Sequence, residues 1–485
     1  MIGITSYGGY IPRYRLNRMV IFQNMGWLLP PSIAVAQGEK SVANWDEDAL
    51  TMAVAAGYDC MTDKDRKALD GVYLASTTLP YLDRLNSGIV STALNVPEGG
   101  VTNVDFASSQ KAGVSAAMSA AEAVQSGEKS NVLVMASDQR CTKMATMYEM
   151  FLGDGAAALL FGKDDVIAEV KGHYSYTCDF VDHYKGRDKN YDYVWEERWI
   201  KDEGYMKIIP EAITGYIKKT GMDLNSFDKV IYPCYFKREH SMIAKKLGLD
   251  PSKVQDNMHE VCGDTGTAHP LVMLIAALEN AKPGDKILMA GFGQGCDVMG
   301  FEVTDKIKGF KGPNGIQNSL ANREELASYQ KYAKFRELIV ADLGLRGETY
   351  GNTALTTLWR KRKVILGLVG GKCTKCGTPQ FIPQDICVNP ECNAIHSLED
   401  YEFASRKGKI LTYTGDMLAA SIDPPAIYGL VTFDEGGRIF CDFTDCVLEK
   451  VKVGQPIKMS FRRKKKDNIR GYHGYFWKAI PQIEQ

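Results

Sequence analysis

The 485-residue sequence contains no run of about 18 apolar residues, the length that a helix needs to cross a membrane. Its beginning, MIGITSYGGYIPRYRL, lacks the basic start and the apolar stretch of a signal peptide. The net charge is also close to zero: 58 basic and 59 acidic residues give a formal charge of −1 at pH 7. That balance gives no global electrostatic reason to expect a nucleic-acid partner. We therefore expect a protein that binds neither a membrane nor nucleic acid.

The chain has 12 cysteines, and four of them form one cluster. The others are too few for the dense disulfide framework that is typical of secreted domains. We therefore expect a reducing, cytoplasmic location.

The clustered cysteines occur as two short pairs, C-T-K-C and C-V-N-P-E-C, separated by ten residues. They are Cys373, Cys376, Cys387 and Cys392. Two such pairs can place four thiolates at the corners of a tetrahedron, the geometry that zinc prefers. A closed shell of four sulfurs leaves no open position for catalysis. We predict a structural zinc ion (Zn2+) in a ribbon over residues 371–400.

The first ~340 residues alternate β-rich apolar runs with alanine-rich helical stretches, which is typical of a mixed or parallel sheet covered by helices. Strands are expected at 71–77, 131–137, 229–235 and 286–293, and helices at 111–127 and 269–285. The pattern occurs twice, around 65–165 and 225–305, and so suggests two similar halves. The sequence thus predicts an α/β domain over 1–345, with halves of about 1–165 and 166–345.

Four further segments complete the plan of the chain. Residues 172–205 are polar and aromatic, and two explanations stay open: an excursion that covers the substrate, or an insertion packed on the surface. Residues 323–344 are expected to form a charged amphipathic helix, and 346–370 a linker and helix. Short strands with period-two patterning over 401–485 suit a small all-β barrel such as an OB-fold.

A basic run, R-R-K-K-K, occupies residues 462–466 in this last region. We interpret it mainly as a solvated hairpin tip. Contact with a CoA phosphate, or with single-stranded nucleic acid in the groove of the barrel, are the alternatives.

Seven short motifs follow one another in the first ~340 residues. They are G-Y-I-P-R-Y-R (9–15), V-D-F-A-S-S-Q-K-A-G (104–113), G-D-G-A-A-A-L-L-F (153–161), G-D-T-G-T-A-H-P (263–270), K-P-G-D-K-I-L (282–288), G-F-G-Q-G (291–295) and Y-Q-K-Y-A-K-F-R (329–336). In sequence and order they resemble the thiolase superfamily, most closely 3-hydroxy-3-methylglutaryl-CoA synthases of the archaeal and bacterial type. The remainder resembles the zinc-ribbon/OB proteins that accompany thiolases and related aldolases in acyl-CoA metabolism.

This resemblance implies a five-layered αβαβα fold that acts on acyl-CoA thioesters, with coenzyme A as part of the substrate. It also implies a homodimer formed through this domain, and a separate thiolase is a further candidate partner. The resemblance does not carry over the family's usual chemistry. Gln110 stands at the position of the acyl-accepting cysteine and Thr77 at that of the catalytic glutamate. Pro233 or one of its neighbours in Y-P-C-Y stands at that of the catalytic histidine. A thiolate attacks a thioester well and a glutamine amide cannot, so an acyl-cysteine intermediate is not expected.

Gln110 is expected to open a helix whose N-terminus points into the active site. The N–H groups of that terminus and the glutamine amide could hold a thioester carbonyl or an enolate oxygen. In some ketoacyl-synthase-like domains, a glutamine at this place accompanies decarboxylation. The alternative is that Gln110 only fills an inactive pocket.

Asp264 and His269 lie on the loop and helix start that follow a predicted strand. Thiolases keep a histidine, and synthases an asparagine, at about the position of Asp264. A carboxylate there could take a proton from a hydroxyl or an α-carbon, and His269 could serve instead or pair with it. The alternatives are an N-cap role for Asp264 and a backbone-bonded histidine at the helix start for His269.

Two further sets of residues are weaker candidates. Tyr232 and Tyr235 flank the missing histidine, and either hydroxyl could move a proton in aldol-type cleavage; packing is the alternative. His259 and Cys262, in H-E-V-C, could restore a nucleophile, although a buried structural cysteine is commoner.

The favoured hypothesis is therefore an enzyme that makes or breaks a carbon–carbon bond in an acyl-CoA, by aldol, retro-aldol or decarboxylative chemistry. All three pass through an enolate beside the thioester. A non-catalytic acyl-CoA-binding or scaffold subunit of a separate thiolase is one alternative, and an acyltransferase that uses Cys262 is another. The catalytic candidates are Gln110, Asp264, His269 and Tyr235.

Overall fold

The structure is a computed structural model that describes residues 1–341 and 354–482. The chain divides into two units. Unit 1 comprises Met1–Ala43, Asp48–Ser91 and Val96–Leu338, and unit 2 comprises Asn44–Glu47, Thr92–Asn95 and the part from Ile339 onward. The boundary expected at residue 345, and the start of the expected linker at 346, lie outside the described residues. Within the described part, no helix has both the length and the apolar character needed to cross a bilayer.

Unit 1 is a mixed α/β structure. Its strands are β1 (Gly3–Tyr10), β2 (Tyr14–Asn17), β3 (Glu39–Val42), β4 (Gly71–Ala75), β5 (Thr102–Phe106), β6 (Val132–Asp138), β7 (Gly155–Gly162), β8 (Ala168–Thr177), β9 (His183–Tyr184), β10 (Tyr193–Val194), β11 (Lys229–Ile231), β12 (Lys286–Phe292), β13 (Gly295–Val303) and β14 (Glu324–Glu325). Its helices are α1 (Arg18–Met25), α2 (Ala49–Cys60), α3 (Asn86–Ala93), α4 (Ala112–Ser126), α5 (Met147–Phe151), α6 (Glu197–Trp199), α7 (Ile209–Thr220), α8 (Lys237–Lys246), α9 (His269–Leu278), α10 (Gly315–Ala321) and α11 (Tyr329–Phe335), and a π-helix covers Ile200–Ile208.

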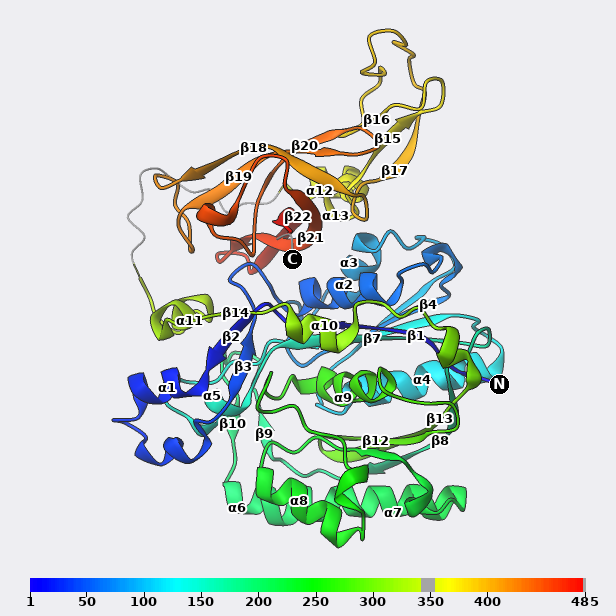
Figure 1. The fold of residues 1–485 in the computed structure, drawn as a ribbon, viewed down its shortest axis with the longest axis vertical. Coiled ribbons are helices and arrows are strands. Elements are labelled where there is room, and N and C mark those ends of the chain that lie inside the picture. Colours follow the sequence, from blue (N-terminus) through cyan, green and yellow to red (C-terminus); the bar gives the residue numbers. More distant parts are fainter. Residues whose placement is uncertain (342–353, 483–485) are drawn as a thin grey trace. The chain divides into compact units, whose positions relative to one another are not determined.

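Nine strands form one sheet in the order β11-β12-β13-β8-β1-β7-β6-β4-β5. Neighbours are parallel between β4 and β5, β4 and β6, and β11 and β12, and antiparallel elsewhere. Figure 1 shows that the two halves of this sheet enclose α4 and α9, while α2 and α10 cover one outer face and α7 and α8 the other. Unit 1 therefore has the five alternating layers of the αβαβα arrangement that the sequence predicted.

The central helices owe their position to small and apolar side chains. All ten residues of α9 are buried, as expected for a helix that is apolar all round and has sheet on both sides. The alanines at 112, 116, 117, 120 and 121 in α4 belong to the same hydrophobic core. Close approach is essential at Gly113, because a Cβ there would lie 2.3 Å from the carbonyl oxygen of Thr267. This contact joins the first turn of α4 to the segment that leads into α9.

The amphipathic helix predicted over 323–344 was mostly wrong. Residues Glu324–Glu325 form β14, which pairs in parallel with β2, and the helix is limited to Tyr329–Phe335. Ser328 caps its start by accepting a hydrogen bond from the N–H of Lys331, and Glu337 has a positive φ of 56°, which a helix cannot continue through. Because Glu324–Glu325 pair with β2, the first residues of the predicted helix form a strand instead. Residues 342–344 lie outside the described residues.

Unit 2 contains two small antiparallel sheets. Its helices are α12 (Leu355–Arg360) and α13 (Arg362–Leu366), and its strands are β15 (Val369–Cys373), β16 (Pro379–Gln380), β17 (Leu398–Glu402), β18 (Gly408–Asp416), β19 (Ala426–Phe433), β20 (Arg438–Asp442), β21 (Pro456–Asp467) and β22 (Tyr472–Pro481). The ribbon sheet has the order β16-β15-β17, and the larger sheet the order β20-β19-β18-β21-β22. Burial alternates residue by residue along β19, which is the period-two pattern read from the sequence. The indole N–H of Trp477 donates to the carbonyl of Leu366 at 2.7 Å, which ties β22 to α13.

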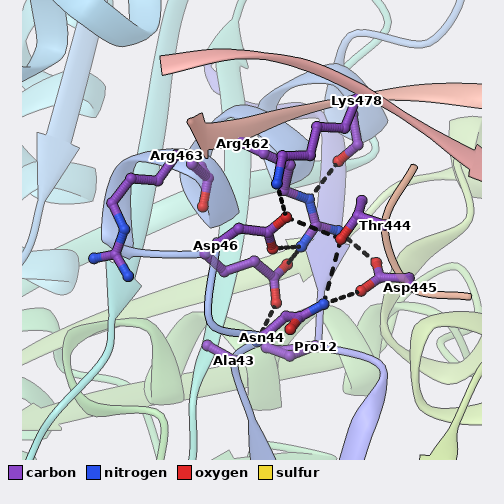
Figure 2. Close-up of polar contacts among 12 residues, drawn as sticks. Pro12, Ala43, Asn44, Asp46, Thr444, Asp445, Arg462, Arg463 and Lys478 are labelled. Carbon is purple, nitrogen blue, oxygen red and sulfur yellow. Dashed lines mark hydrogen bonds and ion pairs between the residues drawn. The ribbon is translucent and has the colours of Figure 1, made fainter. Parts of the chain in front are cut away.

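A buried ion cluster joins β21 and β22 to the segment Asn44–Glu47 within unit 2 (Figure 2). The carboxylate of Asp46 accepts hydrogen bonds from Lys478 at 2.8 Å and from Arg462 at 3.2 Å. Arg462 also meets Glu47 at 2.9 Å and pairs with Asp445. All five side chains are at most 5% exposed.

This cluster corrects the interpretation of the basic run 462–466. The run lies in β21, and the turn of the hairpin comes after it, between β21 and β22. Arg462 is 1% exposed and committed to three carboxylates, so it does not belong to a solvated tip and is not available to a phosphate. Burial by itself would raise the pKa of Asp46, but Lys478 and Arg462 outweigh it and lower that pKa.

We expect Asp46→Asn to lower the free energy of unfolding of unit 2 by about 3–5 kcal/mol, because it leaves Arg462 and Lys478 buried with less compensating charge. The matched control is Asp442→Asn, which removes the exposed pair with Lys464 and should cost under about 1 kcal/mol. Urea denaturation followed by circular dichroism measures both. A lowered carboxyl pKa contributes stability above its usual value, so the deficit of Asp46→Asn should shrink as the pH falls below about 4. Equal stabilities of the two variants at pH 7 would contradict this account.

Candidate functional site

The loop between β5 and α4 carries Gln110. The hydroxyl of Ser109 donates to the carbonyl of Gly293 at 2.7 Å, and Lys111 pairs with Asp297 at 2.8 Å. A Cβ on Gly293 would lie 2.9 Å from the backbone nitrogen of Gln110, so only glycine lets the G-F-G-Q-G loop lie this close. The side-chain nitrogen Nε2 of Gln110 is buried and has no hydrogen-bond partner among the described residues. The amide is therefore a free donor at the head of α4.

A second group of candidates converges on the segment before α9. The Oδ1 atom of Asp264 accepts from the N–H of Gly266 at 2.8 Å, and its Oδ2 atom lies 3.8 Å from Nε2 of His259. The rings of His259 and His269 meet edge to face, with centroids 5.3 Å apart. Asp264 and His259 are 4% and 5% exposed, and His269 is fully buried. One carboxylate and two imidazoles thus share a buried space.

The hydrogen bonds of His269 fix its tautomer. Its Nε2 lies 2.9 Å from the carbonyl oxygen of Asn257, which can only accept, so Nε2 carries the hydrogen. Its Nδ1 then accepts from the N–H of Thr265 at 3.3 Å. The alternative for His269 is present, because its ring is bonded to backbone. Asp264 accepts from the N–H of Gly266, but Thr265 is the N-cap of the 3₁₀ turn Gly266–Ala268, so Asp264 does not have the N-cap role.

Neighbouring groups outweigh burial at Asp264, whereas burial dominates at His269. Burial alone would raise the pKa of Asp264, but His269, His259 and Arg140 outweigh it and hold the pKa well below its usual range. Burial lowers the pKa of His269 to about 4, and Asp264 only partly offsets that effect. At neutral pH Asp264 is ionised and His269 is neutral. An acid this strong has a weakly basic conjugate, so Asp264 is better suited to hold a charge or orient a neighbour than to remove a proton.

Aromatic side chains form one wall of the space. Tyr235 stacks on His259 and on Phe151, at centroid distances of 6.3 and 5.4 Å. Tyr148 and Tyr205 each meet the edge or face of Tyr235 at 5.5 Å. Burial raises the pKa of all three tyrosine hydroxyls well above the usual value, so each keeps its proton at neutral pH. The wall offers hydroxyl donors and no tyrosinate base.

The polar, aromatic segment 172–205 contributes to this site from one side. Asp192 pairs with Arg140 at 2.8 Å, both nearly fully buried, and Asp192 raises the pKa of Arg140 against the effect of burial. Tyr205 packs on Phe292 with centroids 4.5 Å apart. The same segment also has exposed aromatic rings, which belong to Tyr193, Tyr184, Trp195 and Trp199. One part of the segment therefore borders the candidate residues, and another part is surface.

Three positions singled out in the sequence have other tasks here. The hydroxyl of Thr77 donates a hydrogen bond to one carboxylate oxygen of Asp138 at 3.0 Å, and its N–H donates to the other oxygen at 2.8 Å. The hydroxyl of Tyr232 donates to the carbonyl of His240 at 2.9 Å. Cys262 is fully buried, its thiol donates to backbone carbonyls, and burial raises its pKa to about 12. A thiol held protonated in this way is a poor nucleophile, which argues against the acyltransferase alternative.

Sequence reasoning missed several residues of the site. It paired His259 with Cys262, whereas the structure directs His259 toward Asp264. It gave no role to Arg140, Tyr148 or Tyr205. Arg140 follows β6, and its position at the carboxyl end of a predicted strand was a signal that could have identified it.

Two groups of side chains could hold a metal ion. The sulfur atoms of Cys373, Cys376, Cys387 and Cys392 lie within 4.8 Å of one another, with Cys376 and Cys387 at 3.5 Å. Four thiolates so close together on a ribbon fit a structural zinc ion. The ligand atoms of His259, Asp264 and His269 also lie within 4.8 Å of one another, as a possible second grouping.

Three family descriptions match separate segments of the chain. "3-Oxoacyl-[acyl-carrier-protein (ACP)] synthase III C terminal" matches residues 217–303, "ChsH2, rubredoxin-like zinc ribbon domain" matches 366–395, and "ChsH2, C-terminal OB-fold domain" matches 401–462. The ribbon match contains all four cysteines. The predicted α/β fold followed by a zinc ribbon and an OB-fold is thereby confirmed.

Two relatives of known name match about 70% of this chain. Hydroxymethylglutaryl-CoA synthase of Caldivirga maquilingensis is 30% identical over 346 residues, which cover 70% of this chain and 98% of the relative. The enzyme of the same name from Methanopyrus kandleri is 27% identical over 345 residues, covering 69% and 97%.

Two solved structures are similar in fold. An HMG-CoA synthase complexed with CoA has a TM-score of 0.62 at 21% identity and covers 72% of this chain and 94% of that one. A Cys-to-Ser variant of Xanthomonas campestris OleA with bound lauric acid and lauroyl-CoA has a TM-score of 0.55 at 20% identity, with coverages of 62% and 98%.

We expect about one zinc per purified chain, as a closed four-thiolate site requires. Cys373→Ser should lose the metal and unfold the ribbon, because zinc binding supplies folding free energy to such small segments. Cys446→Ser, a cysteine of unit 2 outside the cluster, is the matched control and should keep its zinc. Elemental analysis measures both. Protein without zinc, in which all four clustered cysteines react with an alkylating agent under native conditions, would disprove the site.

Proposed function

Because this chain belongs to the hydroxymethylglutaryl-CoA synthase family, we propose that it makes or breaks a carbon–carbon bond in an acyl-CoA thioester without an acyl-cysteine intermediate. Its unit 1 has the fold of thiolase-superfamily enzymes that form such bonds on acyl-CoA. What is particular to this chain is the residue at the head of α4. The family resemblance expects a cysteine there, and the chain has Gln110.

The observation that carries the proposal is the buried, unpartnered Nε2 of Gln110. A buried donor without a partner is rare in native structures and fits a group that a ligand completes. An enolate oxygen next to a thioester is such a ligand, because negative charge develops on it in aldol, retro-aldol and decarboxylative reactions alike. The start of α4 adds the positive end of the helix dipole at the same place.

Retro-aldol cleavage illustrates the roles that the site can supply. A base takes the proton of a β-hydroxyl, the Cα–Cβ bond breaks, and its electron pair moves onto the thioester as an enolate. The carbonyl product leaves, and Cα of the enolate takes up a proton to give a shorter acyl-CoA. Gln110 would hold the enolate oxygen, Asp264 and His269 would set the charge and shape of the proton-transfer space, and Tyr235 would be the proton donor nearest to it.

A second candidate function follows from unit 2. The zinc-ribbon and OB-fold segments match domains of ChsH2 rather than of hydroxymethylglutaryl-CoA synthase. We therefore keep the proposal that the chain acts as an acyl-CoA-binding or scaffold subunit for a separate thiolase. In either case we propose a homodimer formed through unit 1.

A screen of 3-hydroxyacyl- and 3-oxoacyl-CoA esters for release of a shorter CoA ester tests the enzyme proposal directly. If none is turned over, and a co-purified thiolase gains activity when this chain is added, the scaffold proposal replaces it.

Gln110→Ala should lower turnover by about 10²–10³, the usual effect of removing one oxyanion donor. Gln110→Glu keeps the shape but places a negative charge near the enolate oxygen, so it should be at least as impaired. Gln125→Ala, an exposed position at the far end of α4, should behave like wild type. Steady-state kinetics on the substrate found in the screen measures all three. Wild-type turnover in both Gln110 variants would remove Gln110 from the mechanism.

No covalent acyl-enzyme should form on this chain. Incubation with acetyl-CoA followed by intact-mass measurement should show the unmodified mass, because Gln110 has no nucleophile and burial keeps the Cys262 thiol protonated. A stable acetyl adduct that maps to Cys262 would contradict the proposal and revive the acyltransferase alternative.

A further inference from the structure

One imidazole nitrogen at the candidate site has no hydrogen-bond partner among the described residues. It is Nε2 of His259, in a side chain that is only 5% exposed. Its nearest charged neighbour is Oδ2 of Asp264 at 3.8 Å, which is longer than a hydrogen bond. Native proteins rarely bury such an atom unpaired, so this nitrogen is a candidate for contact with a bound group.

The neighbouring groups are less suited to take up a proton. His269 uses Nε2 on the carbonyl of Asn257 and Nδ1 on the N–H of Thr265. Asp264 already accepts the N–H of Gly266 through its Oδ1 atom. Tyr235 keeps its proton and can only donate one at neutral pH. His259 is left with a ring nitrogen that is uncommitted and close to a carboxylate.

We infer that Nε2 of His259 is the proton-transferring atom of the site and that Asp264 is its positioning partner. This inference rests on the proposed function and names the residue that performs its proton step. In acyl-CoA enolisation, the α-proton passes to Nε2 and the electron pair of the C–H bond moves onto the thioester oxygen. The imidazolium so formed faces the Asp264 carboxylate, which stabilises the added charge. Return of a proton from Nε2 to Cα restores both the thioester and the neutral ring.

The partial reaction can be followed without knowing the physiological acyl group. Full-length protein is incubated with acetyl-CoA or propionyl-CoA in D2O, and loss of the α-proton signal is measured by NMR. Wild type should exchange the α-protons faster than buffer does, and His259→Gln should lower that rate by about 10²–10⁴. Free imidazole should restore part of the exchange in His259→Ala, which a purely structural histidine would not allow.

Asp264→Asn tests the positioning role. It should slow exchange less than His259→Gln does, and the double variant should be no slower than His259→Gln alone, because residues that act as a unit are not additive. His240→Gln is the matched control: His240 also has an unpartnered, buried Nε2, but its ring packs on Tyr232 and forms no ion pair with a carboxylate among the described residues. It should exchange like wild type.

The outcomes separate the inference from the function on which it rests. No exchange by wild type with either ester counts against the enolate function itself. Exchange by wild type that survives in His259→Gln, or that is lost equally in His240→Gln, overturns the role of His259. A second metal ion per chain that disappears in His259→Gln also overturns it, because the imidazole would then be a ligand.

Discussion

The contact between the first turn of α4 and the segment that leads into α9 fixes the two segments that carry Gln110, Asp264 and His269 to each other. Because Gly113 has no side chain, the carbonyl oxygen of Thr267 can lie where it would clash with a Cβ. The N–H of Thr267 in turn donates to Asp138 at 2.8 Å, and the same carboxylate holds Thr77. Three segments far apart in the sequence are thereby fixed to one another. Gln110 lies just before this contact, and Asp264 and His269 lie on either side of it.

Buried charge is handled in the same way in both units, by matching each ion with several partners. Arg140 is held by Asp192 and stabilises Asp264, and Arg462 is held by three carboxylates. Desolvation of such ions is expensive, so each arrangement survives only because its partners are complete. In unit 1, the ionised Asp264 places a negative charge beside Nε2 of His259. In unit 2, the buried ion cluster has a structural role, because it includes a segment from near the start of the sequence.

Under the proposed function, Gln110 limits what the head of α4 can do. A thiolate there forms a bond to the acyl group, whereas an amide can only donate hydrogen bonds to it. The amide of Gln110, the start of α4 and the glycine loop lie together, so the proposed function relies on stabilising an oxyanion rather than on covalent catalysis. Proton transfer is then the step that the proposed function requires of the rest of the site, where Tyr235 stacks on His259.

The sequence by itself determined the zinc ribbon, the α/β alternation of unit 1 and the period-two strands of unit 2. These depend on local spacing: four cysteines on two turns, apolar runs between glycines, and alternation along single strands. It also identified Gln110, Asp264, His269 and Tyr235 as candidates, through motifs of contiguous residues. It failed where a partner distant in sequence decided the outcome. Pairing with β2 turned Glu324–Glu325 into a strand, Asp46 drew Arg462 into the interior, and the turn before α9 directed His259 toward Asp264 rather than Cys262. Only the tertiary structure could decide these, because the free energy of pairing and of burying a charge depends on which groups meet across the fold, and local sequence carries no record of that.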